Sequence, residues 1–506
     1  MKPWAWFAFC LLLVTDPLRC TDYECRTIHR EGGNLWWNCS DTLYPEFPHP
    51  DEIPKGVSLI DLSYNRILDL HRINITCDGY PKCNACLAVL DLRDNEIESI
   101  DKDTFQSLFC LHQLDLSHNR IKGEIINEET FQGLHKLKSL SLKGNPLVSV
   151  PDSSFLFTEL GDLVHLDLSN CKISTIEKLA LSELNVLEYI DLSGNELVTI
   201  DPEVFRGLHF LHTLDLRHNK LVKLGAESFE PLLVLQTLLL DENHIEVIHP
   251  KAFDGLGILE TLSLGTNRLK QIPFLALRAM NNLQLFNFSA NVAGTLSQSP
   301  VRDLKLAITT LIIEDMDTLH DIGNHAFSAL HQLRYVHITR NKFLSSIGHD
   351  VFSSKHLREV FLNDNGLLGL HEDLLSWDDL DELTLQNNRW RCDCNLKWML
   401  ESSRFNYSIT CRTPDKYRGR DLMTLTSSDL RCPRSLLTIF ISCILGIVAI
   451  SLVVAAILCW KYRRHIRLRR VKGKYISVYQ KDVGDEPTTR IELEETDLVS
   501  KYATDD

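Results

Sequence analysis

The feature that most constrains the fold of this chain is a leucine frame that recurs along most of its length. From Leu187 onward the pattern LxxLxLxxNxL returns every 24 residues. The same frame opens at fourteen positions: Val57, Leu87, Leu111, Leu137, Leu163, Leu187, Leu211, Leu235, Leu259, Leu283, Ile308, Leu333, Leu357 and Leu380. Periods of about 20–50 residues are typical of solenoids, in which each copy packs only against its neighbours. We therefore predict a solenoid of fourteen copies over residues 57–387.

The spacing within each copy predicts its local structure. Alternate side chains of the LxL core point inward, so each copy places one short strand on a concave parallel sheet. An asparagine amide is expected to satisfy backbone groups where the chain leaves the strand: Asn65, Asn95, Asn119, Asn145, Asn195, Asn219, Asn243 and Asn267. A phenylalanine is expected to fill the convex half: Phe105, Phe131, Phe155, Phe205, Phe229, Phe253, Phe327 and Phe352. The predicted fold class is α/β, a leucine-rich-repeat horseshoe with these residues as scaffold.

The two ends of the chain predict its compartment. Residues 1–20 combine a basic start, a short apolar run and a polar exit, which is typical of a secretory signal peptide rather than a buried helix. Residues 436–460 are 25 uncharged residues, enough to span a bilayer, and eight cations follow within residues 461–474. We expect a single-pass type I plasma-membrane protein with an extracellular N-terminus. Residues 461–506 are expected to form a disordered cytoplasmic tail.

The cysteines and glycosylation motifs fit an extracellular chain. In residues 21–56, Cys25 and Cys39 are predicted to close an N-terminal cap. Four cysteines surround a lengthened first repeat, and their three pairings remain open: Cys77, Cys83, Cys86 and Cys110. Cys171 replaces the asparagine of the fifth copy and is predicted to be a buried structural thiol rather than a reactive one. Candidate N-glycosylation sites are Asn38, Asn74, Asn287 and Asn406.

Residues 388–433 carry the run Cys392-Asp393-Cys394, followed by Cys411 and Cys432-Pro433. This run resembles the C-terminal cysteine-rich cap of extracellular leucine-rich-repeat proteins. The resemblance implies the pairs Cys392–Cys411 and Cys394–Cys432. A zinc site at the C-x-C pair is the alternative, and no further histidine or cysteine stands at finger spacing.

Residues 21–460 as a whole resemble the Toll-like receptor and neuronal leucine-rich-repeat families, with a capped solenoid followed by one membrane helix. Toll-like receptors continue into a Toll/interleukin-1 receptor domain, and this sequence stops before one. The resemblance therefore implies a recognition receptor, with innate immune recognition as one role, that does not signal directly as Toll-like receptors do.

The strand positions that face the concave side change character along the chain. Six early copies place aspartate between the two inward residues. That acidic stripe is either a binding surface for a basic ligand or simply the commonest sequence of this repeat. Later copies have other residues in place of this aspartate. Residues at or near this position in the later copies are the candidate ligand-binding set: Leu239, Ile312, Arg334, Tyr335, His337, Arg358 and Phe361. The alternative is that these degenerate copies pack against a neighbouring loop. A glycan on Asn287 would stand on the same concave face and block ligands there.

The sequence lacks the motifs of several classes of enzyme, and its net charge is unfavourable for binding nucleic acid. It has no G-x-S-x-G, no phosphate-binding glycine loop and no H-E-x-x-H, so we expect no enzyme, cofactor or metal. A net charge of −15 argues against binding nucleic acid at neutral pH. The predicted function is a receptor or co-receptor for an extracellular protein or microbial ligand, with adhesion protein and non-signalling decoy as alternatives. A homo- or hetero-dimer through the solenoid is compatible with this prediction.

Three features of the membrane-proximal region suggest regulation. Cys459 at the inner membrane edge is a candidate for palmitoylation. Tyr475 and Val478 form a tyrosine-x-x-bulky motif that resembles an endocytic sorting signal, and Tyr475 is also a candidate phosphorylation site. These motifs predict contacts with cytoplasmic adaptors or sorting machinery, and cycling through endosomes. Histidines on the concave side are either a pH switch for that cycle or ordinary solvated side chains.

Overall fold

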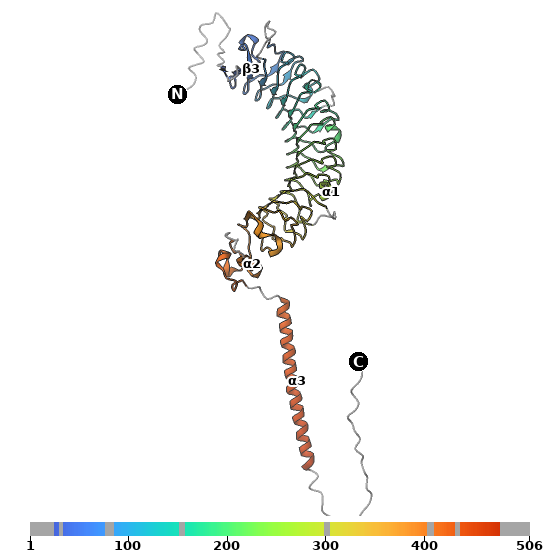
Figure 1. The fold of residues 1–506 in the computed structure, drawn as a ribbon, viewed down its shortest axis with the longest axis vertical. Coiled ribbons are helices and arrows are strands. Elements are labelled where there is room, and N and C mark those ends of the chain that lie inside the picture. Colours follow the sequence, from blue (N-terminus) through green and yellow to red (C-terminus); the bar gives the residue numbers. More distant parts are fainter. Residues whose placement is uncertain are drawn as a thin grey trace, which may run out of the picture. The chain divides into compact units, whose positions relative to one another are not determined.

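The structure is a computed structural model that describes residues 25–29, 34–75, 86–150, 157–297, 304–401, 409–430 and 436–475. The chain divides into two units, residues 1–431 and residues 432–506, and each is described by itself. The first unit is a curved solenoid, in which the repeats stack in a continuous arc from β3 to the region of α2 (Figure 1).

One long sheet runs through the solenoid and holds sixteen of the described strands. Fourteen of them come one from each predicted repeat, and neighbouring repeats pair in parallel, with the central positions of adjacent strands in register. The strands are, in sheet order, β1 (Arg26–His29), β2 (Leu35–Asn38), β3 (Val57–Asp61), β5 (Val89–Asp91), β7 (Gln113–Asp115), β8 (Ser139–Ser141), β10 (His165–Asp167), β12 (Tyr189–Asp191), β13 (Thr213–Asp215), β15 (Thr237–Leu239), β17 (Thr261–Ser263), β18 (Leu285–Asn287), β20 (Thr310–Glu314), β22 (Tyr335–Thr339), β24 (Glu359–Phe361) and β25 (Glu382–Thr384).

Short elements connect these strands around the outside of the solenoid. Small parallel sheets join β4 (Asp69–Leu70) with β6 (Ser99–Ile100), β9 (Ser149–Val150) with β11 (Thr175–Ile176), β14 (Lys223–Leu224) with β16 (Val247–Ile248), and β19 (Thr295–Leu296) with β21 (Asp321–Ile322) and β23 (Ser346–Ile347). The short helices are η1 (Pro50–Glu52), η2 (Gly123–Ile125), η3 (Thr158–Leu160), η4 (Pro202–Phe205), α1 (Phe274–Leu277), η5 (Glu372–Leu374), η6 (Trp377–Asp379), η7 (Cys394–Leu396), α2 (Lys397–Glu401), η8 (Asp415–Tyr417) and η9 (Leu422–Thr424).

The predicted asparagines form a buried ladder that holds adjacent repeats together. Asn195 is one example: its Nδ2 donates to the carbonyl oxygens of Leu168 and Leu192 at 2.9 Å, and its Oδ1 accepts the N–H groups of Cys171 and Ile173 at 2.9 Å. This amide thus satisfies four backbone groups that would otherwise be buried without partners. All eight predicted asparagines are buried, and the ladder extends to Asn291, Asn341, Asn365 and Asn388.

Cys171 takes the place of asparagine in this ladder, as predicted. Its side chain is fully buried, and its Sγ donates to the carbonyl oxygen of Leu142 at 3.2 Å. Burial raises the pKa of the thiol to about 12, so the reactive thiolate is absent at neutral pH. The structural role of this cysteine is therefore confirmed.

The predicted phenylalanines fill the convex half of the core. Phe205, Phe229 and Phe253 are fully buried and stack with ring centroids 6.0 and 6.1 Å apart, so equivalent positions of consecutive repeats lie side by side. Phe155 lies outside the described residues, and Phe157 stacks on Phe131 at 6.5 Å. Ring stacking of this kind adds dispersion energy to the burial of apolar surface.

Disulfides close the first unit near both ends. The predicted pairs Cys25–Cys39 and Cys392–Cys411 are present. Cys394 is also disulfide-bonded, whereas its predicted partner Cys432 lies outside the described residues. Of the four cysteines whose pairing was open, Cys86 and Cys110 pair with each other, and Cys77 and Cys83 lie outside the described residues.

The described part of the second unit is one helix, α3 (Leu436–Tyr475), of 40 residues. Residues Phe440–Arg463 are apolar and long enough to cross a membrane, and none of that segment is buried against protein. The helix continues fifteen residues beyond the predicted boundary at Trp460. No proline interrupts this basic stretch, and arginine and lysine are good helix formers. Val478 lies outside the described residues.

Candidate functional site

The concave face has two chemically different halves. Between their two inward-facing residues, six of the seven early strands present an aspartate, and the exception is β8, which has Ser141. The six residues are Asp61, Asp91, Asp115, Asp167, Asp191 and Asp215. We call these six residues the acidic ladder. From β15 onward the same position carries apolar, polar and aromatic side chains instead.

The carboxylates of the acidic ladder are engaged within their own repeats. In each copy Oδ1 accepts the backbone N–H of the residue two positions later, at 2.8–3.1 Å. This bond shapes the turn that leads off the strand. Asp215 also accepts two bonds from Arg217, with the Nη2–Oδ2 distance 2.6 Å. The structure therefore favours the scaffold interpretation of the stripe over a face for a basic ligand.

Burial makes ionisation of two of these carboxylates costly. The pKa of Asp91 is raised to about 6, chiefly by burial and to a smaller extent by the neighbouring Asp115 and Asp61, against the lowering effect of the Arg93 N–H and guanidinium. Burial also raises the pKa of Asp191, with Asp215 and Asp167 adding to the effect. Asp91 and Asp191 bind their turns although their ionisation is disfavoured, which agrees with a role in turn geometry.

A polar cluster separates the two halves. Asp241 Oδ1 accepts from Ser263 Oγ at 2.5 Å and from the N–H of Gly265 at 3.0 Å, and Asn287 Nδ2 donates to both Asp241 and Ser263. A Cβ at Gly265 would lie 2.6 Å from Asp241 Oδ1 and 3.0 Å from Asn287 Nδ2, so only glycine leaves room for the cluster. The amide of Asn287, which is a candidate glycosylation site, is thus engaged inside the fold.

Most of the sequence-predicted binding residues come together beyond this cluster. Ile312 on β20 is in register with His337 on β22, and His337 with Phe361 on β24. The rings of His337 and Phe361 stack with centroids 4.6 Å apart and planes 23° apart. Tyr335 lies two residues before His337 on β22, and so on the same face of the sheet, beside Thr310 and Glu359. All four predicted side chains are half-buried on the sheet face, and neighbouring strands are about 5 Å apart.

Two arginines border these side chains. Arg334 and Arg358 immediately precede β22 and β24, both are exposed, and the N–H of Arg358 donates to the carbonyl of Arg334 at 2.9 Å. Within the described ranges no acidic side chain forms an ion pair with either. We call Ile312, Arg334, Tyr335, His337, Arg358 and Phe361 together the C-terminal concave patch. It combines an apolar and aromatic surface with two arginines that form no ion pair with an acidic side chain of the described residues. Protein interfaces favour this composition.

Leu239 does not belong to this patch. It lies on β15, which is separated from β20 by β17 and β18, and its neighbours in register are Asp215 and Ser263. The prediction grouped it with the patch because its repeat position is equivalent, but the intervening strands keep it apart.

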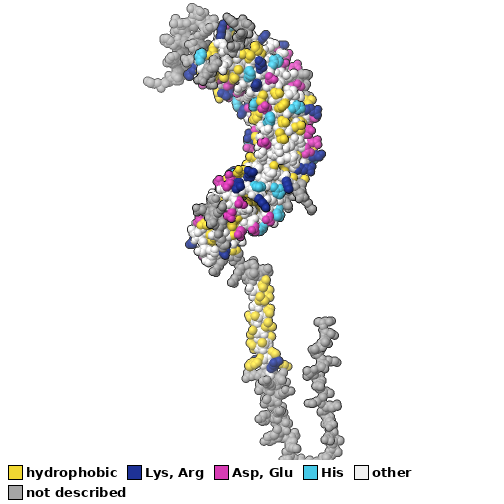
Figure 2. All heavy atoms as spheres, in the orientation of Figure 1, with side chains coloured by type: hydrophobic (Ala, Val, Ile, Leu, Met, Phe, Trp, Pro, Cys, Tyr) yellow, Lys and Arg dark blue, Asp and Glu magenta, His cyan; other side chains and the backbone are white. Residues whose placement is uncertain are grey.

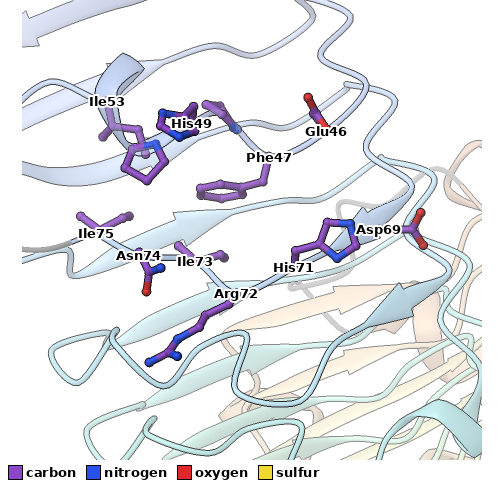
Figure 3. A pocket seen from close by; sticks show the side chains of 12 residues that line it. Glu46, Phe47, His49, Ile53, Asp69, His71, Arg72, Ile73, Asn74 and Ile75 are labelled. Atoms are coloured by element: carbon purple, nitrogen blue, oxygen red, sulfur yellow. The ribbon is translucent and has the colours of Figure 1, made fainter.

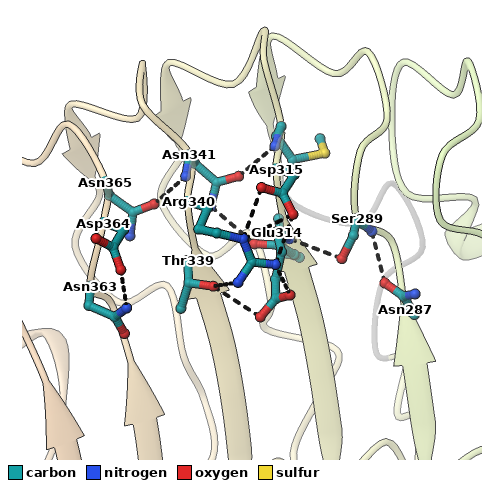
Figure 4. A network of polar contacts seen from close by, with 12 residues as sticks. Asn287, Ser289, Glu314, Asp315, Thr339, Arg340, Asn341, Asn363, Asp364 and Asn365 are labelled. Carbon is teal, nitrogen blue, oxygen red and sulfur yellow. Dashed lines mark hydrogen bonds and ion pairs between the residues drawn. The ribbon is translucent and has the colours of Figure 1, made fainter.

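A third arginine that the sequence places among these side chains, Arg340, is fully engaged in ion pairs. Its guanidinium pairs with Glu314 at 2.7 Å and with Asp315 at 2.8 Å, and Thr339 Oγ1 donates to Glu314 at 2.9 Å (Figure 4). Figure 2 shows basic and acidic side chains side by side at the inner edge of the later repeats. These ion pairs form the border between the patch and the turn that follows each strand.

Sequence reasoning missed an apolar stripe on the side of the solenoid. Its members stand one or two positions before the first leucine of the sixth to ninth repeats, and their exposed fractions are 37–62%: Val186, Phe210, Leu233 and Ile258. The sequence does contain a signal for these residues. Other repeats carry a polar side chain directly before their first leucine, namely Lys136, Asp162 and Asn282, whereas these four repeats carry hydrophobic residues there. Exposed apolar side chains that gather in this way mark interaction surfaces.

Comparison with known proteins agrees with the repeat architecture. A family model described as leucine rich repeat matches residues 86–147, 136–197, 161–221, 185–245 and 233–292. A second, described as a BspA type leucine rich repeat region, matches residues 304–391. Between them the two models account for most of the solenoid. No group of three or more histidine, cysteine, aspartate or glutamate side chains that could hold a metal occurs among the described residues.

Curated relatives match only part of the chain. Mouse trophoblast glycoprotein is 36% identical over 132 residues, which are 24% of this chain and 30% of that protein. Chicken Tsukushi is 33% identical over 129 residues, 26% of this chain and 33% of that protein. Rat leucine-rich repeat-containing G-protein coupled receptor 5 is 37% identical over 121 residues, 24% of this chain and 11% of that protein. The chain thus spans about a third or less of the length of these relatives.

A solved structure shares the fold over a longer range. Mouse RP105, in a complex with MD-1, superposes with a TM-score of 0.52 at 18% identity, covering 77% of each chain. At this level of identity the likeness shows the fold alone.

Proposed function

Because this chain is a leucine-rich-repeat protein with one apolar helix long enough to cross a membrane, we propose that it is a single-pass cell-surface receptor or co-receptor. In this proposal the solenoid binds an extracellular protein or a microbial product, and partner proteins carry the signal. The proposed topology is type I, with residues 1–20 as signal peptide and residues 461–506 in the cytoplasm. The role is binding rather than catalysis.

The observation that carries this proposal is the C-terminal concave patch. Its aromatic and aliphatic side chains lie half-buried on a rigid sheet, and Arg334 and Arg358 beside them have no acidic partner among the described residues. Rigid aromatic anchors with arginines at the border are the residue types that dominate binding energy at protein interfaces. The acidic ladder lacks this property because its carboxylates already bind their own turns.

The repeats of mouse RP105 are seen in a complex with MD-1, which is consistent with a protein partner for the same fold here. In this proposal glycans stand on Asn74 and on Asn406, which lies outside the described residues. Cys459 is an exposed thiol on α3 and the proposed palmitoylation site. The motif of Tyr475 and Val478 is the proposed contact for sorting machinery.

A cell-mixing experiment tests the receptor proposal against adhesion. Cells that express the full chain, or the chain truncated after Lys474, are mixed with labelled expressing and non-expressing cells. The receptor proposal predicts no clustering, together with a ligand-dependent intracellular response that truncation abolishes. Clustering that survives truncation would instead establish adhesion. A ligand that binds and elicits no response from the full chain would indicate a decoy.

The apolar stripe is the proposed contact between two copies of the chain. A two-fold axis between the seventh and eighth repeats would place Arg206 of one copy near Glu230 of the other, since these two stand at equivalent repeat positions. It would also bring Phe210 of one copy close to Leu233 of the other, which stand one and two residues before the first leucine of their repeats. Four side chains are too few for a tight interface in solution, but anchoring in one membrane raises the effective concentration. Replacing Phe210 with Glu should abolish proximity labelling between two tagged copies at the cell surface, and unchanged labelling would refute this contact.

A further inference from the structure

A hollow near the N-terminal end of the solenoid is lined by the N-terminal cap and the first repeat rather than by strands of the concave sheet. Its volume is about 170 Å³, and it lies between the segment that contains η1 and the segment that follows β4 (Figure 3). Its apolar lining comes from Phe47, Ile53, Ile73 and Ile75. Pockets for drug-sized ligands are larger, about 300–1,000 Å³, so this hollow has room for one small ring.

One residue of its lining is itself a glycosylation acceptor. Asn74 lines the hollow and opens the motif Asn74-Ile75-Thr76. Its side chain is exposed, and its amide has no hydrogen-bond partner among the described residues. The two other described acceptors differ: the amide of Asn287 donates to Asp241 and Ser263, and Oδ1 of Asn38 accepts from Ser40. The bonds of Asn287 occupy the nitrogen that would carry a sugar, whereas those of Asn38 involve only its oxygen. Asn74 has an exposed amide that is free to carry a sugar.

The chemistry of the hollow matches a sugar ring. A pyranose has an apolar C–H face, which packs on a flat aromatic side chain and leaves water as any apolar surface does. Figure 3 shows the ring of Phe47 over Ile73, with Ile75 and Asn74 beside it. Phe47 is only partly buried against the core, so part of its ring faces the hollow. The N-acetyl methyl group of the first sugar needs such an apolar wall as well.

Polar groups at the rim suit the hydroxyl and amide groups of the same sugar. The Arg72 side chain is exposed and uses Nη2 to donate to Gln106 at 3.2 Å, which leaves further N–H groups. His71 pairs with Asp101 at 2.8 Å across the neighbouring repeat, so its ring is held in place. A rim of donors around an apolar floor is the usual arrangement of a small-molecule site.

We propose that this hollow is the seat of the chain's own Asn74 glycan, in which the first N-acetylglucosamine packs against Phe47, Ile53, Ile73 and Ile75. Because the sugar is tethered within the hollow, its effective concentration there is high, and weak contacts suffice to hold it. The docked sugar covers the apolar floor and joins the N-terminal cap to the first repeats. It therefore stabilises this end of the solenoid, and this role is independent of the receptor proposal.

The test is a double-mutant cycle on the full chain, expressed in mammalian cells and purified in detergent. Thr76→Ala removes the glycan but keeps Asn74, and Phe47→Leu keeps an apolar side chain but removes the flat ring. Intact-glycopeptide mass spectrometry first measures occupancy of Asn74, and thermal unfolding is then followed for the four combinations. Thr76→Ala should lower the unfolding midpoint by several degrees when Phe47 is present and by less than half as much in Phe47→Leu. An equal loss in both backgrounds, or an unoccupied Asn74, would overturn the proposal.

Enzymatic trimming gives a second test that needs no substitution. An endoglycosidase that leaves the first N-acetylglucosamine on Asn74 should preserve the unfolding midpoint. An amidase that removes the whole glycan, and leaves aspartate at position 74, should lower the midpoint about as much as Thr76→Ala does, and the loss should be less than half as large in Phe47→Leu. If trimming to one sugar lowers the midpoint as much as complete removal, the outer sugars act instead and the proposed seat is wrong.

Discussion

The acidic ladder and the C-terminal concave patch occupy the same positions of the same repeat, yet they use their side chains differently. In the acidic ladder each carboxylate binds the N–H of its own turn, and Asp215 additionally binds Arg217. In the patch, Ile312, His337 and Phe361 meet across strands and make no hydrogen bond that the turn requires. The comparison teaches that charge on a repeat surface is weak evidence of a binding site until its hydrogen bonds are known.

The largest effect on folding is expected from a substitution in the asparagine ladder, which supports both halves of the concave face. Asn195→Leu would leave two carbonyls and two N–H groups buried without partners, at about 1–3 kcal/mol each. We expect the variant to be retained inside the cell, as measured by surface staining. Cys171→Asn is the matched control, since it restores the usual residue one repeat earlier, and it should reach the surface normally. Normal surface levels of Asn195→Leu would show that the ladder is not the shared support.

A charge removal tests whether the acidic ladder serves its turns. Asp91→Asn keeps the oxygen that accepts the Arg93 N–H but removes a carboxylate whose pKa is raised from 3.8 to about 6 in the folded state. A raised acid pKa means that the folded state holds the proton more tightly, so the cost of ionisation is absent below about pH 4 and grows as pH rises through 6. The variant should be more stable than the parent by about 1–3 kcal/mol at pH 7.5.

The measurement for Asp91→Asn is thermal unfolding of the purified chain at several pH values. The two proteins should have similar stability at about pH 4, diverge as the pH rises from about 4 to about 6, and keep a constant difference above about pH 6. Asp91→Ala, which also loses the turn acceptor, should be less stable than Asp91→Asn by about 1 kcal/mol. A destabilised Asp91→Asn at neutral pH would contradict this account of the ladder.

The smallest effect is expected at the border of the patch. Arg340 is about half exposed, so its pairs with Glu314 and Asp315 are screened by water and salt. Arg340→Gln should cost less than about 1 kcal/mol, and the difference should shrink at high salt. Denaturant titration at low and high salt measures both. A loss of several kcal/mol that salt does not change would mean that this pair is part of the core.

Periodicity was enough to predict which residues hold the solenoid. The spacing of leucines placed one strand per repeat, the asparagines fell in the buried ladder, and Cys171 proved to be buried where the frame put it. These positions are local and repeat with the frame, so one copy informs the next. The C-terminal pair Cys392–Cys411 followed from a resemblance rather than from spacing.

The functional surfaces were harder to predict from the sequence, because the fold brings together residues that no repeat spacing relates. Leu239 shares its repeat position with Phe361 but lies three strands from β20, so repeat position alone grouped it wrongly. The cluster of Asp241, Ser263 and Asn287 depends on the absence of a Cβ at Gly265. The hollow beside Asn74 requires Phe47 from the cap, and no spacing rule connects the two.

The most direct test of the central claim compares patch and ladder in one binding assay. A fluorescent tetramer of residues 21–435 is titrated onto a panel of cell lines, and the line that stains most strongly is kept. Tyr335→Ala combined with Phe361→Ala should weaken half-maximal staining at least about tenfold. Leu239→Ala, a half-buried apolar residue outside the patch, and Asp167→Asn combined with Asp191→Asn should stain as the parent does. Loss of staining in the aspartate variant, with the patch variant unchanged, would contradict the account.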